Sequence, residues 1–132
     1  PDETGLMQTK ELQERFVAVW TMLENEFSDI NNVAFELLNE VVNASADEWN
    51  SLAQKTVNAI RNLNKDRIIV VGGVNWNSPG SLDKLHIFDD DNIIYTYHCY
   101  EPYEFTHQQG VLQAGPLYYN RKMPYPSEDI ER

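Results

Sequence analysis

Three short apolar runs alternate with helical or turn-rich segments along this chain of 132 residues, and no other feature constrains its fold as strongly. The runs span residues 33–38, 68–72 and 92–98, and each is apolar on both of its faces. Strands of this kind, joined by crossover segments, typically pair in parallel with helices covering the sheet. The sequence therefore predicts an α/β fold with a parallel sheet, formed by residues 1–132 as a single domain.

Two segments have the apolar periodicity of amphipathic helices. Residues 9–27 and 46–63 both carry apolar side chains at three- and four-residue steps. Ser45, followed three residues later by Glu48, is a capping-box signature at the start of the second helix. A turn or short helix is expected around residues 79–85, before the last strand.

Composition narrows the classes of partner. Twenty-one acidic against ten basic residues give a net charge of −11, which disfavours binding to nucleic acid or to an anionic membrane. A single cysteine, Cys99, excludes an internal disulfide and a multi-cysteine metal site. The chain contains no apolar run of about 18 residues and does not open with a charged-then-apolar leader. Residues 101–132 are rich in Pro, Gly, Tyr and Gln, which predicts a long loop.

Polar and aromatic side chains follow all three predicted strands. Because the carboxyl ends of parallel strands meet at one edge of a sheet, these side chains are expected to lie close together. Amides and phenols hydrogen-bond hydroxyl groups, and an indole can stack on a sugar ring, so the set suits a polyhydroxylated ligand. A phosphate site is disfavoured because no lysine follows the glycine pair in a Gly-rich loop. In strand order the residues are Asn39 and Glu40; Asn75, Trp76 and Asn77; His98, Cys99 and Tyr100.

Structural interpretations stand beside these functional ones. Glu40 can be simply the first solvated residue of a loop, and His98 can be a hydrogen-bonded core histidine. Trp20 and Trp49 lie on apolar helix faces and are expected in the core. His86 and His107 are interpreted as surface residues. Glu40, His98, Glu101 and His107 include metal-binding residue types, but no local spacing such as His-x-x-x-His supports a metal site.

The runs FELLNE, RIIVVGGVNW and NIIYTYHCYEP together resemble the central part of glycoside hydrolase family 5. This family comprises cellulase-like retaining glycosidases built on a (β/α)8 barrel, and the similarity covers roughly residues 9–109. The Asn-Glu pair ending one strand and the His-x-Tyr ending the strand two later carry most of it. The resemblance implies a partial barrel, about strands 4 to 6 with the intervening helices.

The resemblance also implies residue roles. Glu40 matches the general acid/base, and Asn39 matches the residue that hydrogen-bonds the 2-hydroxyl of the sugar. His98 and Tyr100 match the pair lining the cleavage subsite, where Tyr100 would also orient the nucleophile. Further candidates for substrate binding follow strands two and three: Trp76, Asn77, Tyr103, Phe105, His107 and Gln108.

The chain departs from the family pattern in two places. Val41 stands where a proline commonly follows the Asn-Glu pair, which changes backbone rigidity and not the chemistry. The nucleophilic glutamate, an arginine and a further histidine of the family have no counterpart here. Glu101, Glu104 and Glu128 are not convincing substitutes, because they lie in the predicted loop or beyond it. A complete barrel needs about 250 residues, so the chain is interpreted as a fragment.

The resemblance therefore implies part of an endo-β-1,4-glucanase that hydrolyses β-linked polysaccharide by double displacement without a metal or cofactor. The fragment alone is expected to be incomplete or inactive. The parent protein is expected to be secreted or at the cell surface. The alternative is a non-catalytic oligosaccharide-binding or purely structural barrel fragment. The open sheet also suggests self-association or pairing with the missing barrel parts.

Overall fold

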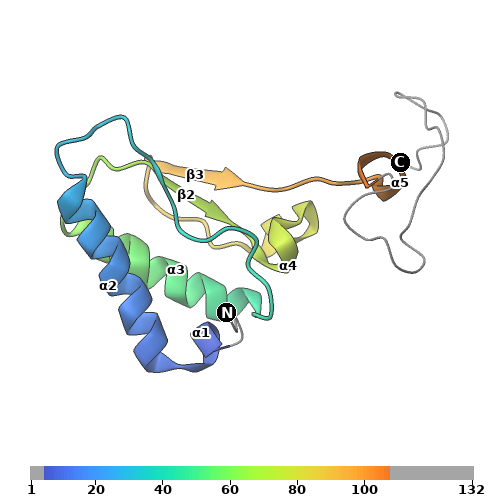
Figure 1. Ribbon diagram of the computed structural model, residues 1–132, viewed down its shortest axis with the longest axis horizontal. Helices are drawn as coiled ribbons and strands as arrows, with labels where there is room; N and C mark the ends of the chain where they lie inside the picture. The colour runs from blue at the N-terminus through green and yellow to red at the C-terminus, as the bar shows by residue number, and fades with distance from the viewer. Residues whose placement is uncertain (1–4, 108–132) are drawn as a thin grey trace. The chain divides into compact units, whose positions relative to one another are not determined.

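The computed structural model describes residues 5–107 of the chain (Figure 1). The chain divides into two units, residues 1–98 and residues 99–132, and the predicted site residues fall in both. The first unit contains a helical layer and a small sheet. Its elements in chain order are α1 (Gly5–Gln8), α2 (Lys10–Glu26), β1 (Phe35–Glu36), α3 (Ala46–Arg61), β2 (Ile69–Gly72), α4 (Val74–Asn77), a 3-10 helix (Pro79–Lys84) and β3 (Ile93–Thr96).

The three strands form one sheet in the order β1-β2-β3, and both pairs are parallel. The register places Phe35 beside Ile69 and Ile69 beside Ile93. Helices α2 and α3 lie together on one side of this sheet (Figure 1). The predicted α/β class with parallel pairing is therefore confirmed.

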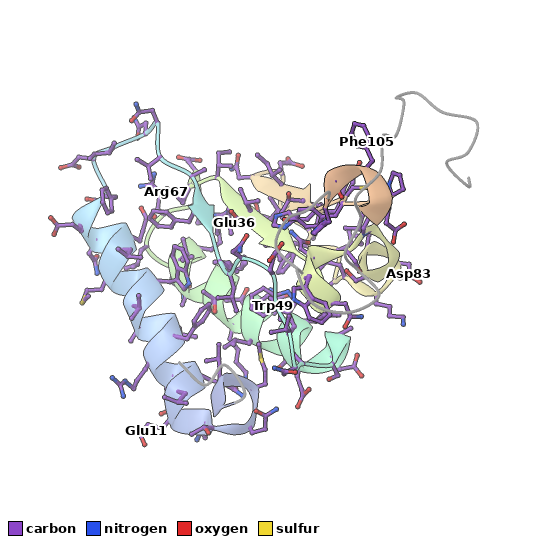
Figure 2. The ribbon with its side chains drawn as sticks, turned by 45° about the vertical axis from the view of Figure 1, so that its right-hand side comes forward. Glu11, Glu36, Trp49, Arg67, Asp83 and Phe105 are labelled. Carbon is purple, nitrogen blue, oxygen red and sulfur yellow. The ribbon has the colours of Figure 1, made fainter. Side chains whose placement is uncertain are left out.

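The core lies between the sheet and the two long helices. Trp49 of α3 is fully buried, and its indole Nε1 donates a hydrogen bond to the carbonyl of Gly72 at 2.8 Å (Figure 2). Trp20 of α2 is partly buried and packs its ring 5.2 Å from that of Phe35. Both tryptophans thus join helix and strand, as their positions on apolar helix faces predict.

Helix α3 begins with the capping box that the sequence indicates. The Ser45 hydroxyl accepts from the Glu48 amide, and the Glu48 carboxylate accepts from the Ser45 amide at 2.8 Å. The hydrogen bonds that the Glu48 carboxylate accepts from the Ser45 amide and from the Ser45 hydroxyl hold the pKa of Glu48 below its usual range. Two amide groups that a helix start leaves unsatisfied are paired in this way.

A buried ion pair fastens the end of α2 to the start of β2. Arg67 and Glu24 are 3% and 1% exposed, and Arg67 Nε lies 2.7 Å from Glu24 Oε2. The remaining guanidinium hydrogens reach Glu24 Oε1 and three carbonyls, those of Phe27, Ile30 and Val33. The guanidinium also lies over the Phe35 ring, 4.7 Å from its centre. All five donors of Arg67 are therefore used, which satisfies the condition for burying this charge.

Burial alone would raise the pKa of the Glu24 carboxyl. Hydrogen bonds from Arg67 and Asn64, together with the charge of Arg67, outweigh that effect and hold the pKa of Glu24 below its usual range. The carboxylate is therefore ionised at neutral pH in spite of its burial.

All three strands are shorter than predicted: β2 lacks only one residue, and side-chain or loop contacts explain the larger differences at β1 and β3. Residues 33–38 were expected to form one strand, but the carbonyl of Val33 accepts from Arg67 and only Phe35–Glu36 is strand. Residues 92–98 were expected to form another, but the amide of His98 donates to the carbonyl of Asn77, and β3 ends at Thr96. Backbone groups engaged elsewhere cannot extend the ladder.

The second unit is described over residues 99–107. It contains one helical turn, α5 (Tyr103–Thr106), within the segment predicted as a loop. Pro102 precedes this turn and its carbonyl accepts from the Phe105 amide at 2.9 Å. Proline suits the start of a helix because its φ angle is already near the helical value, which explains a helical turn within the segment predicted as a loop. The rest of the predicted loop lies outside the described residues.

Candidate active site at the carboxyl edge of the sheet

Glu40 and His98 meet at the edge where the strands end. Glu40 follows β1 and His98 follows β3, and their side chains approach to 2.8 Å between Oε1 and Nδ1. The two side chains are 27% and 26% exposed, so the pair is open to solvent on one side. Parallel pairing of β1, β2 and β3 brings together residues that are 58 positions apart in the sequence.

This contact allows a proton to be held in either of two ways. When Glu40 is ionised, the Nδ1–H group of His98 donates to the carboxylate; when Glu40 is protonated, it can donate to a bare Nδ1. A carboxyl group held this way has a fixed orientation and a second site for its proton. Such a pair is suited to general acid/base chemistry.

The backbone at Glu40 is unusual for a residue with a side chain. Its φ angle is 49°, in the left-handed region, and Asn43 nearby has φ 53°. Non-glycine residues in that region cost on the order of 1–3 kcal/mol and cluster at functional sites. Val41 forms an isolated parallel bridge with Val74, and its carbonyl accepts from the amide of Trp76 at 3.2 Å. These contacts hold the turn that presents Glu40.

The segment after β2 has three consecutive left-handed residues, Asn75, Trp76 and Asn77, with φ between 53° and 57°. This conformation leaves the Trp76 indole 63% exposed. It turns Asn77 inward, where the side chain is 1% exposed and its Oδ1 accepts from the amide of Gly73 at 2.8 Å. Trp76 is therefore placed where a ring could stack on it.

The Asn77 side chain lies in the interior, and its assignment as a substrate-binding residue stays a prediction. The reason is local: Gly72 has no side chain, and a Cβ atom there would stand 2.3 Å from Asn77 Oδ1. The carbonyl of Asn77 accepts from the amide of His98 at 2.8 Å. In this structure Asn77 therefore supports the backbone of His98.

The other predicted site residues are placed as follows. Asn39 is exposed directly before Glu40. In the second unit, the rings of Tyr100 and His107 lie edge to face with their centres 5.5 Å apart, and Phe105 is exposed. Tyr103 belongs to α5, and Gln108 lies outside the described residues. Their substrate contacts stay predictions.

Between residues 5 and 107, no group of three or more His, Cys, Asp or Glu side chains is arranged to hold a metal ion. Within the same range, no helix has the length and apolar character needed to cross a membrane.

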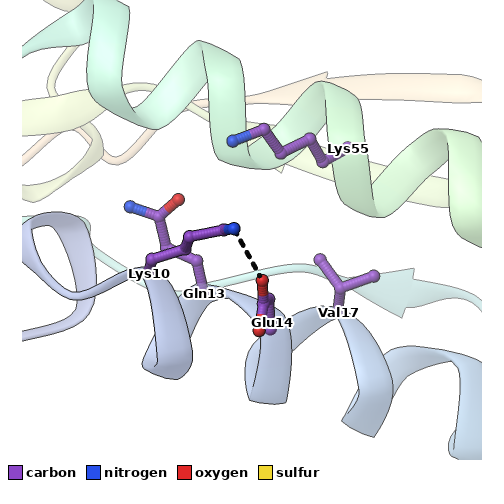
Figure 3. A pocket seen from close by; sticks show the side chains of 5 residues that line it. All are labelled: Lys10, Gln13, Glu14, Val17 and Lys55. Atoms are coloured by element: carbon purple, nitrogen blue, oxygen red, sulfur yellow. Dashed lines mark ion pairs between the residues drawn. The ribbon is translucent and has the colours of Figure 1, made fainter.

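A groove between α2 and α3 contains none of the predicted site residues (Figure 3). Its one ion pair joins Lys10 to Glu14 at 3.5 Å, and both side chains are largely exposed. Exposed pairs of this kind contribute little to stability. The lining residues are Lys10, Gln13, Glu14, Val17 and Lys55.

Parallel strands joined by crossover segments, with a carboxylate paired to a histidine at their carboxyl edge, are the arrangement seen at the catalytic edge of (β/α)8-barrel enzymes. Comparison with protein families matches residues 2–129 to the family described as cellulase, glycosyl hydrolase family 5. The chain belongs to this family. The family resemblance inferred from the strand ends is thus confirmed.

Named relatives and solved structures agree with this assignment. The chain is 40% identical to Endoglucanase C of Acetivibrio thermocellus over 124 residues, covering 93% of this chain and 36% of that protein. Cellodextrinase A of Ruminococcus flavefaciens is 37% identical over 80% of this chain and 32% of its own length. The Thermotoga maritima Cel5A structure with cellobiose is 33% identical with a TM-score of 0.79, covering 92% of this chain and 41% of that one.

A structure of the cellulose synthase subunit Z from Clostridioides difficile has a TM-score of 0.82 at 27% identity, covering 93% of this chain and 42% of that one. The chain thus spans about a third of the length of the curated relatives it matches. It is part of a barrel, as the strand count predicts.

Proposed function

We propose that this chain is the central segment of an endo-β-1,4-glucanase in which Glu40 is the general acid/base. Family membership supports the reaction class, and the names of the relatives support the substrate class. The single observation that carries the proposal is the 2.8 Å contact between Glu40 Oε1 and His98 Nδ1 at the carboxyl edge of the sheet. That edge is where barrel enzymes hold their catalytic groups.

The reaction follows the retaining scheme. A carboxylate from a barrel strand beyond this chain attacks the anomeric carbon, while Glu40 donates its proton to the glycosidic oxygen that leaves. Glu40 then removes a proton from water, which attacks the glycosyl-enzyme and releases the sugar with its configuration retained. The two carboxyl groups need a separation of about 5–5.5 Å, so the strand carrying the nucleophile must lie close to Glu40.

The remaining candidate residues have supporting roles in the proposal. His98 orients the Glu40 carboxyl, and Asn77 positions the backbone of His98. Asn39 hydrogen-bonds the sugar's 2-hydroxyl, and the exposed Trp76 offers a stacking surface. Tyr100 and the aromatic and polar residues after it contact the sugar or orient the nucleophile.

The test is a chimera in which residues 2–129 replace the matched segment of Endoglucanase C from Acetivibrio thermocellus. Glu40→Gln is expected to lower turnover of carboxymethyl-cellulose by at least about 100-fold, because the leaving oxygen is no longer protonated. Glu26→Gln, on the exposed surface of α2, is the matched control and should leave turnover unchanged. Turnover that survives Glu40→Gln would refute the assignment.

A second substrate separates a role in proton transfer from a role in folding. An aryl β-cellobioside with an acidic phenol leaves without protonation, so Glu40→Gln should still form the glycosyl-enzyme and release a burst of phenol. Added azide, which needs no general base, should then accelerate steady-state turnover. A variant that binds cello-oligosaccharide normally but shows neither burst nor azide effect contradicts the acid/base role.

The proposal extends to the parent protein. Polymeric β-glucan does not enter cells, so the parent is proposed to act in the medium or at the cell surface. Immunodetection of the parent protein only in the cytosol of a producing culture would contradict this. The missing barrel strands are proposed to come from polypeptide that pairs with this chain.

A further inference from the structure

Residues 84–92, which lead from the 3-10 helix to β3, lie beside α3 and are fastened to it at two points. Near the start of α3, the Asn50 Oδ1 accepts from the amide of His86 at 3.0 Å. At the last residue of α3, Arg61 Nε lies 2.6 Å from Asp90 Oδ2. The two points are eleven helix residues apart, which corresponds to about 16 Å along the helix axis. The segment therefore forms a fixed wall along much of α3.

A groove of about 390 Å³ runs between α3 and this wall. The crossover from β2 to β3 contains only the four-residue α4 and the six-residue 3-10 helix (Figure 1). A long crossover helix, which in a barrel covers the outside of the sheet, is therefore missing at this position, and the flank of α3 stays open. The groove is lined by Gln54, Val57, Asn58 and Arg61 of α3 and by residues 86–90.

The groove combines buried apolar residues with exposed rings and aliphatic groups. Val57 and Phe88 are buried members of the core. The exposed imidazole of His86 stands edge to face on the Phe88 ring, with the ring centres 4.8 Å apart. Ile87, beside it, is 72% exposed. Such a surface suits the C–H face of a sugar ring, which packs on aromatic and aliphatic groups.

Two amide side chains on α3 supply polar groups along the same groove. The Gln54 Nε2 donates to the Asn58 Oδ1 at 2.9 Å, one helical turn further on. This contact leaves the Gln54 Oε1 as an acceptor and the Asn58 Nδ2 as a donor. Because each sugar hydroxyl can both donate and accept, neighbouring hydroxyls match such a pair. The amides are also held in place by each other before any ligand binds, which lowers the entropic cost of binding.

The charges in the groove favour a neutral ligand. Hydrogen bonds from Arg61 hold the pKa of Asp90 below its usual range, so the two groups form an ionised pair that is neutral as a whole. The groove contains no lysine, and the net charge of −11 on the chain repels anions. Among residues 5–107 no cluster of His, Cys, Asp and Glu is arranged to hold a metal ion. An anionic ligand and a bound cation are both disfavoured.

We propose that the groove between α3 and residues 86–90 is a second binding site, which holds a neutral β-linked glucan chain outside the catalytic edge. The choice of glucan among neutral sugars rests on the proposed function. Helix α3 begins shortly after Glu40 and ends before β2 starts, so the groove leads away from the edge where Glu40 and His98 meet. A polymer bound there remains near the enzyme while another stretch of it enters the catalytic edge, which raises its effective concentration.

NMR titration of the 132-residue chain with cellohexaose tests where the sugar binds. The chain carries Glu40→Gln so that the probe is not hydrolysed. Amide shifts that saturate are expected at Gln54, Asn58 and residues 86–90, in addition to any at the catalytic edge. Shifts confined to the catalytic edge overturn this inference and leave the proposed function standing. Absence of shifts at both places overturns the inference and also counts against glucan as the substrate. Shifts at the groove that grow with protein concentration and need no sugar overturn it in favour of contact between copies.

Alanine variants in the chimera with Endoglucanase C test what the groove contributes. The double variant Gln54→Ala/Asn58→Ala removes the donor and the acceptor and keeps good helix-forming residues. Its KM for soluble mixed-linkage β-glucan is expected to rise at least about five-fold, whereas kcat/KM for an aryl β-cellobioside, which is too short to reach both sites, should not change. Asn25→Ala, an exposed amide of α2, is the matched control and should alter neither value. An unchanged KM for the polymer, or an equal loss on both substrates, overturns the inference.

Discussion

Gly72 is the last residue of β2 and lies against the Asn77 side chain. Asn77 in turn holds the backbone of His98. The space for the Asn77 amide exists only because residue 72 has no Cβ atom. The carbonyl of Asn77 in turn accepts from the amide of His98, whose ring meets Glu40. Gly72 is therefore connected through Asn77 and His98 to Glu40, the candidate proton donor.

Replacing Gly72 by alanine should destabilise the chain by about 1–3 kcal/mol, because the buried Asn77 must move or its neighbours must shift. Gly80→Ala is the matched control, since nothing lies within 4 Å of a Cβ atom built there. Urea denaturation of the two variants measures the difference in the free energy of unfolding. Equal midpoints for both variants would show that Asn77 is free to move aside.

The alternation of apolar runs reflects the sheet directly and therefore places Glu40 and His98 at strand ends, whereas the Asn-Glu pair and the His-x-Tyr motif carry the family resemblance. The sequence indicates Asn77 only as a substrate-binding candidate, because the left-handed backbone that turns its side chain inward has no clear signal in a segment such as Asn75-Trp76-Asn77. The sequence also gives no indication of the Glu24–Arg67 ion pair, whose members are 43 residues apart. Periodicity identifies Glu24 only as a helix residue, and contact with Arg67 depends on how α2 packs.

At the scale of elements, the Glu24–Arg67 pair joins α2, the loop after it and β2. Replacing Glu24 by glutamine leaves a buried guanidinium without its counter-charge, which is expected to cost about 3–5 kcal/mol at neutral pH. Glu26→Gln, two residues away and exposed, should change the free energy of unfolding by less than about 0.5 kcal/mol. Thermal or urea unfolding at pH 7 checks the comparison. If Glu24→Gln lowers the free energy of unfolding no more than Glu26→Gln does, the stabilising role of the Glu24–Arg67 pair is contradicted.

The same pair makes stability depend on pH in a defined direction. The pKa of Glu24 is lowered in the folded chain, so at acidic pH its carboxyl group binds fewer protons there than in the unfolded chain. The stabilisation that ionised Glu24 contributes is fully present above about pH 4.3, the pKa of a glutamate in the unfolded chain. It is lost as pH falls through the lower pKa that Glu24 has in the folded chain. Unfolding midpoints measured between pH 7 and pH 3 should therefore fall less steeply for Glu24→Gln than for the unaltered chain. Parallel curves would contradict the direction of the shift.

Helix α3 carries a second element-scale prediction, at its capping box. Ser45→Ala removes the hydroxyl that accepts from the Glu48 amide, and should cost about 1 kcal/mol. Ser51→Ala, an exposed position inside the same helix, should be neutral or slightly stabilising because alanine favours helix. Circular dichroism during urea unfolding distinguishes the two variants. A Ser45→Ala variant as stable as Ser51→Ala would show that another group caps the helix.

At the scale of the whole molecule, net charge opposes the association that an open sheet invites. Exposed apolar side chains such as Val19 and Ile94 favour contact between copies, whereas 21 acidic residues against ten basic ones keep the copies apart. The balance depends on pH, because the net charge vanishes near the sequence pI of about 4.5. The chain should therefore be most dispersed near pH 7 and associate increasingly as pH approaches 4.5.

Light scattering at fixed protein concentration, at pH 7 and at pH 4.5, measures this change in mean mass. Raising the salt concentration at pH 7 should move the result toward that at pH 4.5, because screening weakens the same repulsion. Circular dichroism at each pH checks that the helices persist, so that association is not mistaken for unfolding. A monodisperse monomer under all three conditions would mean that the exposed apolar surface is too small to drive contact. An increase in mass that salt does not reproduce would mean that protonation of particular carboxylates, and not net charge, controls association.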